Sequence, residues 1–419
     1  MKFRTLFLLF MVSLIVIPEL SYQSASANTI QSTIESYLGD EIIISDRSSE
    51  EFSPAIAYNS TRDQYLVVWE NVWPGGYHDI YAQRISSTGK LLSWFAVSSD
   101  TNSKTNPSVA YDPVNDRFLV VWAHDYWGNG SDWDIHGRFI PWNGPDPSLI
   151  DFTICDWNSF QAHPVVTYAR SQEEYLVVWQ STSAGVPGYI SGRRVFADGG
   201  MGDDFTISSG PQIRDFPDIT YNLARNEYLV VWDLEINASN IDIYARRLRG
   251  DGIPLGDEFV IAGWPNFEAE PSVAACDKSD QYMVAWQSDQ GTGGADYAIY
   301  ARYVNGDAIP GNIYLIDDTT SPELNVDISC NASGRQYLLA WQTRYVNLKY
   351  GIWARIAFPN EMLEPQFPVV HSNSTQNREY PAIGGGWSSY LVAWEHEDAT
   401  RDIHGRLLRN ITFLPIMEK

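Results

Sequence analysis

Seven short apolar segments, each five residues long and ending in tryptophan, recur along the chain. The first reads Tyr-Leu-Val-Val-Trp over residues 65–69, and the other copies vary it only slightly. The tryptophans are Trp69, Trp122, Trp179, Trp232, Trp286, Trp341 and Trp394, at spacings of 53, 57, 53, 54, 55 and 53 residues. A period of this size indicates a repeat architecture. Because every position of each segment is apolar, the pattern predicts strands that are covered on both faces.

Three further strand-like pieces accompany each apolar segment. One begins with proline, as in Pro54–Tyr58, at a point where a strand need not donate a backbone hydrogen bond. A second runs from aspartate to arginine, as in Asp79–Arg84 and Asp134–Arg138, and a third begins with phenylalanine, as in Phe152–Cys155. Turn residues separate the pieces, and no helical periodicity occurs. The pattern predicts an all-β fold, a seven-bladed β-propeller of four-stranded antiparallel blades.

The two ends of the repeat region predict how the ring closes. The seventh unit contains Pro381–Ile383, the apolar segment and Asp402–Arg406, but no fourth piece follows. Residues 41–46, near the start, match the fourth-strand pattern. We therefore expect this N-terminal strand to join the last blade and leave no free edge. The expected organisation is a signal peptide over 1–27, a short linker over 28–40, the propeller over 41–412 and a tail over 413–419.

The N-terminal sequence and the overall charge narrow the compartment and the partners. Lys2 and Arg4 precede an apolar run, and Ala25 and Ala27 form a small-residue cleavage site, which is typical of a secretory signal peptide. The protein is expected to be secreted, extracellular or at the cell surface, with no membrane insertion, and monomeric. Its net charge of −24 argues against nucleic acid as a partner, because phosphate backbones are repelled.

The strand sequences resemble a blade repeat of secreted bacterial β-propeller proteins, in which a "VVVW" strand is followed by an "AQRF"-like strand. The matching residues here are Val67–Trp69, Ala82–Arg84 and Phe95–Val97, and the resemblance extends over residues 41–408. It implies a propeller on the cell exterior. Since the motif is a blade consensus, it implies no catalytic residue.

Three cysteines are too few for a disulfide scaffold. Cys276 and Cys330 fall at nearly the same point of the fifth and sixth repeats, so neighbouring blades would bring them close together. Whether they form a disulfide depends on a Cα separation that the sequence does not supply. Cys155 is expected to be buried and unpaired.

Residues that the repeats do not share are the candidates for function, because one ligand in a central channel meets each blade differently. The repeated tryptophans and arginines are therefore assigned to the framework. Two positions vary and are expected near the channel mouth. The first precedes the innermost strand and comprises Ser53, Asn106, His163, Phe216, Glu270, Asn325 and Tyr380. The second follows the tryptophan and comprises Glu70, Ala123, Gln180, Asp233, Gln287, Gln342 and Glu395. His163, Asp233, Glu270 and Glu395 are the leading polar candidates, although capping of neighbouring loops explains the second set better than ligand binding does.

Aromatic residues gather in loops expected on the same face, and flat rings suit sugars as well as protein partners. The candidates are Trp73, Trp127, Trp133, Trp157 and Trp264, beside Asn106, His163, Glu270 and Tyr380 from the first variable position. Packing under long loops explains the tryptophans equally well.

Catalytic and metal motifs are scarce. No zinc-protease, serine-hydrolase, phosphate-loop or sialidase-type sequence box is found. Asp125, Asp132 and Asp134 belong to a stretch in which oxygen-bearing side chains alternate with other residues, and such oxygens suit Ca²⁺. Their spacing departs from that of a helix–loop–helix calcium-binding loop. No other cofactor is expected.

Three hypotheses about function remain. The leading one is a secreted, non-catalytic recognition module that binds an extracellular glycan or protein through the loop face around the channel. The alternative is a polysaccharide hydrolase or lyase that uses Asp233, Glu270, Glu395 and His163, since paired carboxylates cleave glycosides. The third is a structural component of the cell surface.

Overall fold

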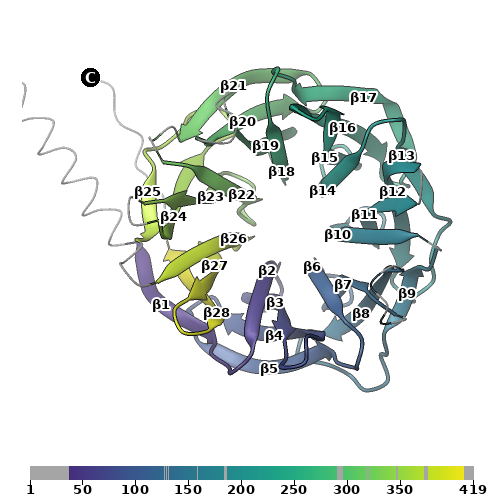
Figure 1. Ribbon diagram of the computed structural model, residues 1–419, viewed down its shortest axis with the longest axis vertical. Helices are drawn as coiled ribbons and strands as arrows, with labels where there is room; N and C mark the ends of the chain where they lie inside the picture. Colours follow the sequence, from purple (N-terminus) through teal and green to yellow (C-terminus); the bar gives the residue numbers. More distant parts are fainter. Residues whose placement is uncertain are drawn as a thin grey trace, which may run out of the picture. The chain divides into compact units, whose positions relative to one another are not determined.

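The computed structural model describes residues 37–409, apart from residues 127, 129, 131, 158, 184, 185, 290–295, 318, 320, 346, 347 and 372–375. The described residues form seven four-stranded antiparallel sheets, arranged as blades around a central opening (Figure 1). The seven-bladed propeller expected from the sequence is confirmed. Within this part of the chain, no helix has the length and apolar character needed to cross a membrane.

The strands of each blade follow one another from the centre outwards. Blades 1 to 3 comprise β2 (Glu50–Asn59), β3 (Gln64–Val72), β4 (His78–Ser86) and β5 (Leu91–Ser98); β6 (Lys104–Asp112), β7 (Arg117–His124), β8 (Asp134–Pro141) and β9 (Phe152–Cys155); and β10 (Phe160–Ala169), β11 (Glu174–Ser183), β12 (Val186–Phe196) and β13 (Phe205–Ser208). Blades 4 and 5 comprise β14 (Arg214–Asn222), β15 (Glu227–Asn237), β16 (Asn240–Arg249) and β17 (Pro254–Ala262); and β18 (Glu268–Cys276), β19 (Gln281–Ser288), β20 (Ala298–Asn305) and β21 (Pro310–Asp317). Blade 6 comprises β22 (Glu323–Cys330), β23 (Tyr337–Arg344), β24 (Tyr350–Ala357) and β25 (Phe367–Val370), and blade 7 comprises β26 (Asn377–Gly385), β27 (Ser389–Glu397), β28 (Arg401–Arg409) and β1 (Leu38–Ser45).

The first strand of the chain completes the last blade. β1 pairs antiparallel with β28, with Ile42 opposite Gly405 and Ile43 opposite His404, so the two ends of the described chain lie side by side (Figure 1). The expected closure is therefore confirmed, although β1 begins at Leu38, inside the stretch expected to be a linker. The proposed signal peptide and the tail lie outside the described residues.

The apolar segments form the interfaces between blades. All seven tryptophans are fully buried, at 0% exposure. Trp179 of blade 3, for example, belongs to the same buried cluster as Leu119 and Val121 of blade 2. Both faces of each second strand are therefore covered, which explains why the segments are apolar at every position.

Arginines on the third strands link each blade to the one before it. The guanidinium groups of Arg138, Arg193, Arg246, Arg302 and Arg355 each donate to a carbonyl oxygen of the preceding blade's outer strand at 2.6–2.7 Å, and Arg406 makes the same bond. In blade 1 the register places Gln83, not Arg84, at this position. The expectation that all seven blades share the arginine is thus wrong for blade 1. The interface between blades 7 and 1 lacks this link in the described structure.

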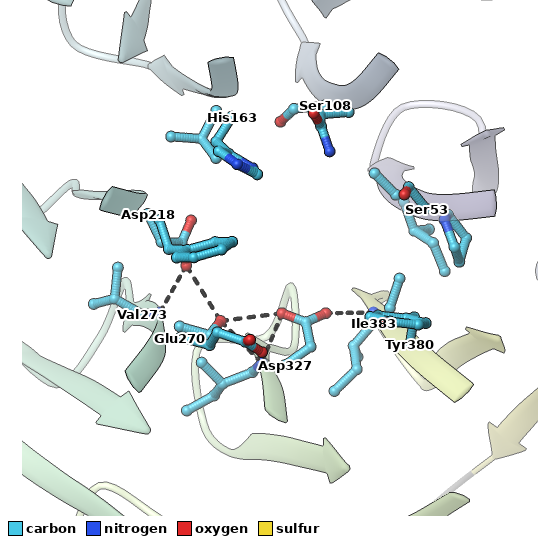
Figure 2. Close-up of a pocket in the computed structure, with 18 of the residues that line it drawn as sticks. Ser53, Ser108, His163, Asp218, Glu270, Val273, Asp327, Tyr380 and Ile383 are labelled. Atoms are coloured by element: carbon cyan, nitrogen blue, oxygen red, sulfur yellow. Dashed lines mark hydrogen bonds between the residues drawn. The ribbon is translucent and has the colours of Figure 1, made fainter. Parts of the chain in front are cut away.

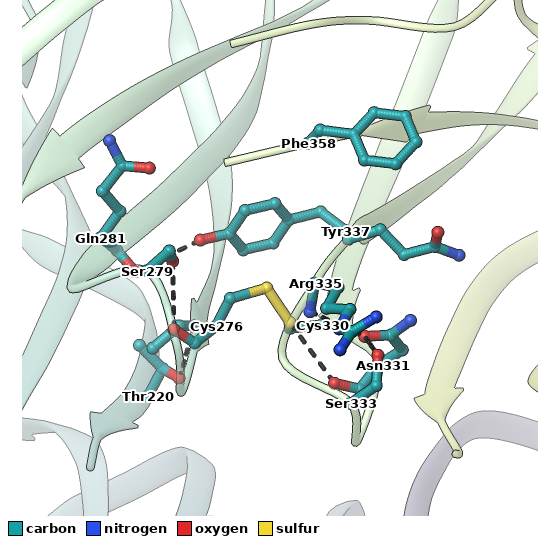
Figure 3. The surroundings of a disulfide bond; sticks show 12 residues. Thr220, Cys276, Ser279, Gln281, Cys330, Asn331, Ser333, Arg335, Tyr337 and Phe358 are labelled. Atoms are coloured by element: carbon teal, nitrogen blue, oxygen red, sulfur yellow. Dashed lines mark hydrogen bonds between the residues drawn. A yellow bond between two sulfur atoms is a disulfide. The ribbon is translucent and has the colours of Figure 1, made fainter. Parts of the chain in front are cut away.

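A disulfide joins two neighbouring innermost strands. Cys276 ends β18 and Cys330 ends β22, and their sulfur atoms are bonded with the Cα atoms 5.4 Å apart (Figure 3). The bond therefore links blades 5 and 6 directly. Cys155 is buried and unpaired.

A ring of buried polar residues lies where the innermost strands begin. Its members are Glu51, Lys104, Gln161, Arg214, Glu268, Glu323 and Arg378. Burial raises the pKa of Glu51 to about 7 and the pKa of Glu268 to about 8. These carboxyl groups stay protonated in the folded protein at a pH where the unfolded chain has already lost their protons.

This difference predicts that the folded protein becomes less stable as the pH rises from about 6.5 to about 8.5, because the raised pKa values favour the folded state only while the carboxyl groups hold their protons. We expect a melting temperature several degrees lower at the alkaline end. Glu268→Gln should weaken this dependence of the melting temperature on pH. Glu50→Gln, at the exposed first residue of β2, should leave it unchanged. Thermal unfolding at a series of pH values measures how the melting temperature depends on pH. A melting temperature that rises over this window would contradict the assignment.

Candidate functional site

Each innermost strand begins with a bulge. In all seven blades the register between the first and second strands shifts at the same place, as between Phe52 and Ala55 in blade 1. One residue of each bulge has a positive φ, a conformation that costs a residue other than glycine about 1–2 kcal/mol. These residues are Ser53, Asn106, His163, Phe216, Glu270, Asn325 and Tyr380, with φ between 45° and 53°. The backbone conformation is common to all blades and belongs to the framework, whereas the seven side chains differ. We call these seven residues the mouth ring.

The residues that follow the buried tryptophans support the mouth ring from the preceding blade. Glu70, Asp233, Gln287, Gln342 and Glu395 accept the backbone N–H groups of Asn106, Glu270, Asn325, Tyr380 and Ser53, at 2.8–3.3 Å. Blade 2 carries Ala123 at this position, and in blade 4 Asp215 accepts the N–H of Phe216 at 2.7 Å. The five bonds from the preceding blades hold their strained bulges in place across the blade interfaces.

Two of the acids considered for catalysis, Asp233 and Glu395, therefore have a capping position. Their exposed fractions are 5% and 2%, and neither lines the central cavity. Burial raises the pKa of Glu395 to about 7 and also raises that of Asp233, while the N–H groups that they accept oppose the shift. The geometry matches the capping alternative that the sequence left open.

The mouth ring surrounds a central cavity of about 780 Å³. All seven of its residues line the cavity, together with the residues that follow them on the innermost strands (Figure 2). Phe216 and Tyr380 are 38% and 48% exposed. Of the polar candidates, His163, Glu270 and Asn106 thus come together with Tyr380 around one space.

Blades 3 to 5 make one side of this cavity acidic. His163 Nε2 lies 3.9 Å from Asp215 Oδ1, and the ring of His163 packs on Phe216 with centroids 4.6 Å apart. Burial lowers the pKa of His163, and the negative charge of Asp215 opposes that shift. Burial also raises the pKa of Glu270, and the negative charge of Asp215 adds to that upward shift. This side therefore offers hydrogen-bonding groups beside an aromatic face.

A second acidic group, missed in the sequence, lies deeper in the cavity wall. Ser272 Oγ is 3.2 Å from Asp218 Oδ2 and 3.1 Å from Asp327 Oδ1 (Figure 2). Burial raises the pKa of Asp218 to about 7 and that of Asp327 to about 6. Both carboxylates also accept backbone N–H groups of the next blade, from Val273 at 2.8 Å and Ile383 at 2.7 Å. The signal that would have revealed them was variation at the second residue after each mouth-ring position, which is Asp218 in blade 4 and Asp327 in blade 6.

Of the tryptophans proposed as ligand-binding residues, the four that the structure describes do not line the cavity. Trp73 donates to Asp79 at 2.7 Å, and Trp264 packs edge-on against Tyr300 with centroids 4.9 Å apart. Trp133 and Trp157 pack against Phe160 and Tyr189. Trp127 lies outside the described residues. These four tryptophans thus contact neighbouring side chains and do not join the mouth ring.

The three aspartates considered for Ca²⁺ do not converge. Among described residues, the only group of three or more His, Cys, Asp or Glu side chains that places its ligand atoms within 4.8 Å of one another is Glu41, His396 and His404. Asp125 instead accepts the N–H of Gly130 at 2.9 Å. Burial raises the pKa of Asp134 to about 6, with help from the charges of Asp132 and Asp156.

Comparison with known proteins supplies the fold but no family. No family model matches the chain, and no curated protein matches it. Solved structures with a similar fold include a puromycin hydrolase (10% identity, TM-score 0.55, 89% of this chain and 55% of that one) and a Hadza microbial sialidase (10%, 0.51, 86% and 66%). An α-L-arabinofuranosidase of Fusarium graminearum is similar at 12% identity and a TM-score of 0.50, over 78% of this chain and 99% of that one. The chain thus spans about half to two thirds of the first two proteins. At these identities the likeness establishes the propeller fold.

Proposed function

We propose that the protein is an exported recognition module that binds a neutral or amino-sugar glycan at the mouth ring, without cleaving it. The observation that carries the proposal is the contrast within the ring, where a shared, strained backbone presents seven unshared side chains to one cavity. Export rests on the sequence of residues 1–27.

The composition of the cavity favours a sugar over other ligands. Phe216 and Tyr380 present exposed rings, against which sugar rings stack. Asn106, His163 and Glu270 add donors and acceptors that suit hydroxyl groups. A cavity of about 780 Å³ has the volume of a ligand site for a small oligosaccharide.

The charges of the cavity set the class of sugar. Glu270, Asp218 and Asp327 line it, whereas no lysine or arginine is found among its described lining residues. An anionic sugar would meet carboxylates without a compensating cation, which disfavours its binding. A neutral or positively charged sugar has no such penalty. Some propellers of similar fold are named for sialic acid or arabinose chemistry, and this cavity fits the neutral class better.

Glycoside hydrolysis is the second candidate, and Asp218 with Asp327 is the observation in its favour. Two carboxyl groups with raised pKa values, joined through one hydroxyl group, have the chemical character of an acid and base pair. However, each carboxylate already accepts backbone N–H groups from two strands, Asp218 from Ile219 and Val273, and Asp327 from Ile328 and Ile383. These bonds hold neighbouring innermost strands together, so the geometry supports binding better than catalysis.

A glycan array probed with the purified protein tests this function. We expect binding to neutral or amino-sugar oligosaccharides and not to sialylated or uronic-acid glycans. Glu270→Gln should weaken the best interaction about tenfold, because a charged hydrogen bond is lost. The matched control is Glu173→Gln, a carboxylate on an exposed turn of blade 3 outside the cavity.

Incubation with the bound oligosaccharide separates binding from cleavage. The proposal predicts that no new reducing ends or unsaturated products form over hours. Turnover that Asp218→Asn or Glu270→Gln abolishes would show a hydrolase or lyase instead. Selective binding to anionic glycans, or to a protein with no glycan, would also contradict the proposal.

A further inference from the structure

A second polar site lies outside the central channel, at the junction that closes the ring. Glu41 on β1, His396 on β27 and His404 on β28 are contributed by three adjacent strands of blade 7. One ligand atom from each lies within 4.8 Å of the other two. Two imidazoles and a carboxylate are the side chains that bind zinc and related ions.

The two histidines are arranged as a pair whose bonding is incomplete. Their rings are stacked, with centroids 3.9 Å apart and an interplanar angle of 5°. Nδ1 of His404 lies 2.8 Å from Glu41 Oε1, whereas Nδ1 of His396 is 3.7 Å from the same atom. His396 is only 4% exposed, and its Nδ1 has no hydrogen-bond partner. A buried nitrogen without a partner is costly, and a metal ion would satisfy it.

The surroundings favour a cation and leave room for a further ligand. The site opens into a cavity of about 460 Å³ that is also lined by Asp46, Asp398, Asp402 and Arg378. Four carboxylates, including that of Glu41, thus face a single guanidinium group, which is itself bonded to Gln376 at 2.9 Å. The net charge of the side chains that line the cavity is negative. An ion held by three side chains would have a fourth coordination position for a water molecule.

Blade 2 provides an internal comparison. His124 and His136 occupy the same register positions as His396 and His404, but their rings are perpendicular, at 89°. The ammonium group of the buried Lys104 lies next to them, on Asp100 and the carbonyl of Asn102. The carboxylate that corresponds to Glu41 is Asp151, which accepts a hydrogen bond from Ser98 instead of from a histidine. At the position of Lys104, blade 7 carries Arg378, whose guanidinium group lines the same cavity as His396 and His404. The two blades therefore differ in the stacking of their histidines and in the contact of His404 with Glu41.

We propose that Glu41, His396 and His404 form a binding site for one divalent transition-metal ion, with zinc as the ion that best suits the ligand set. Nδ1 of each histidine and a carboxylate oxygen of Glu41 supply three ligands, and water supplies the fourth. Since Glu41 belongs to β1 and the histidines to β27 and β28, the ion clamps the N-terminal strand onto the last blade. The site is independent of the mouth ring and of the proposed glycan.

Metal titration of the chelator-treated protein tests the site. We expect one equivalent of Zn²⁺ to bind and to raise the melting temperature by a few degrees, and Co²⁺ to give the visible absorption of a tetrahedral site. His404→Ala and Glu41→Gln should each weaken zinc binding at least about tenfold. Glu41→Gln keeps the size of the side chain, so it remains informative if the histidine variant does not fold.

The matched control is the double variant His124→Ala and His136→Ala, which should bind zinc as the unaltered protein does. Absence of stoichiometric zinc binding would overturn the proposal. So would binding that survives Glu41→Gln and His404→Ala unchanged, because the ion would then be held elsewhere.

Discussion

A protein that begins at Arg47, and so lacks β1, is expected to lose the cooperatively folded propeller. β1 covers the outer edge of β28, and its Ile44 is 4% exposed in a cluster with Ile403 and Leu407. Burial of one isoleucine is worth about 2 kcal/mol, and β1 buries part of Ile42 as well. Removal would also leave β28 as an open edge that can pair with other chains. The combined loss is a large fraction of the stability of a typical domain.

The junction between blades 7 and 1 lacks the arginine link that joins the other blades. Six blades are tied to the preceding blade by an arginine, whereas blade 1 carries Gln83 at that position. A hydrophobic cluster and several hydrogen bonds, including those from Ser45 to Glu51 and from Tyr65 to the carbonyl oxygen of Ser389, join blades 7 and 1 instead. Without β1, that cluster is exposed on its outer side.

Circular dichroism, thermal unfolding and size-exclusion chromatography measure the effect of the truncation. A protein that begins at Tyr37 is the control and should unfold cooperatively as a monomer. Addition of the peptide Leu38–Ser45 should restore part of the stability of the shorter protein. A shorter protein that melts at the temperature of the control would show that the ring does not depend on β1.

Loss of the disulfide is expected to lower the free energy of unfolding by about 4 kcal/mol. Cys276 and Cys330 are separated by 54 residues, and a cross-link that closes a loop of this length restricts the unfolded chain by about that amount. The double variant Cys276→Ser and Cys330→Ser should therefore unfold at a lower denaturant concentration than the oxidised protein.

A reducing agent provides the matched comparison for the disulfide. It should shift the unfolding midpoint of the unaltered protein towards that of the double variant and leave the double variant unchanged. Equal midpoints for the oxidised and reduced protein would contradict the stabilising role, because the third cysteine, Cys155, is unpaired.

The fold could be predicted from the sequence because its signals are local and repeated. An apolar segment ending in tryptophan needs cover on both faces, and seven copies of it specify seven blades. The seventh unit lacks its fourth strand, and residues 41–46 match the fourth-strand pattern, so the repeat also predicted the closure by β1. The arginine of blade 1 was misplaced by one residue, since Arg84 lies next to the register position that Gln83 occupies. Register depends on pairing with β3, which spacing alone does not determine.

The candidate site was predictable only in part. The mouth ring stood out because its side chains differ between blades, and the structure places all of them around one cavity. The roles of Asp233 and Glu395 depend on backbone N–H groups of the next blade, which follow from the bulge geometry and not from residue type. The grouping of Asp218, Ser272 and Asp327 requires three blades to meet. The same holds for Glu41, His396 and His404, because Glu41 is more than 350 residues distant in the chain.

The central claim is that the unshared side chains of the mouth ring bind the ligand. Its most direct test is calorimetric titration of the best array oligosaccharide into the double variant Phe216→Ala and Tyr380→Ala. The control is the double variant Trp94→Ala and Trp387→Ala, whose rings are more than half exposed but do not line the cavity. Loss of two stacking rings, at about 1.4 kcal/mol each, predicts a loss of affinity of about 100-fold for the first variant and none for the second. Equal affinity of both double variants and the unaltered protein would contradict the account.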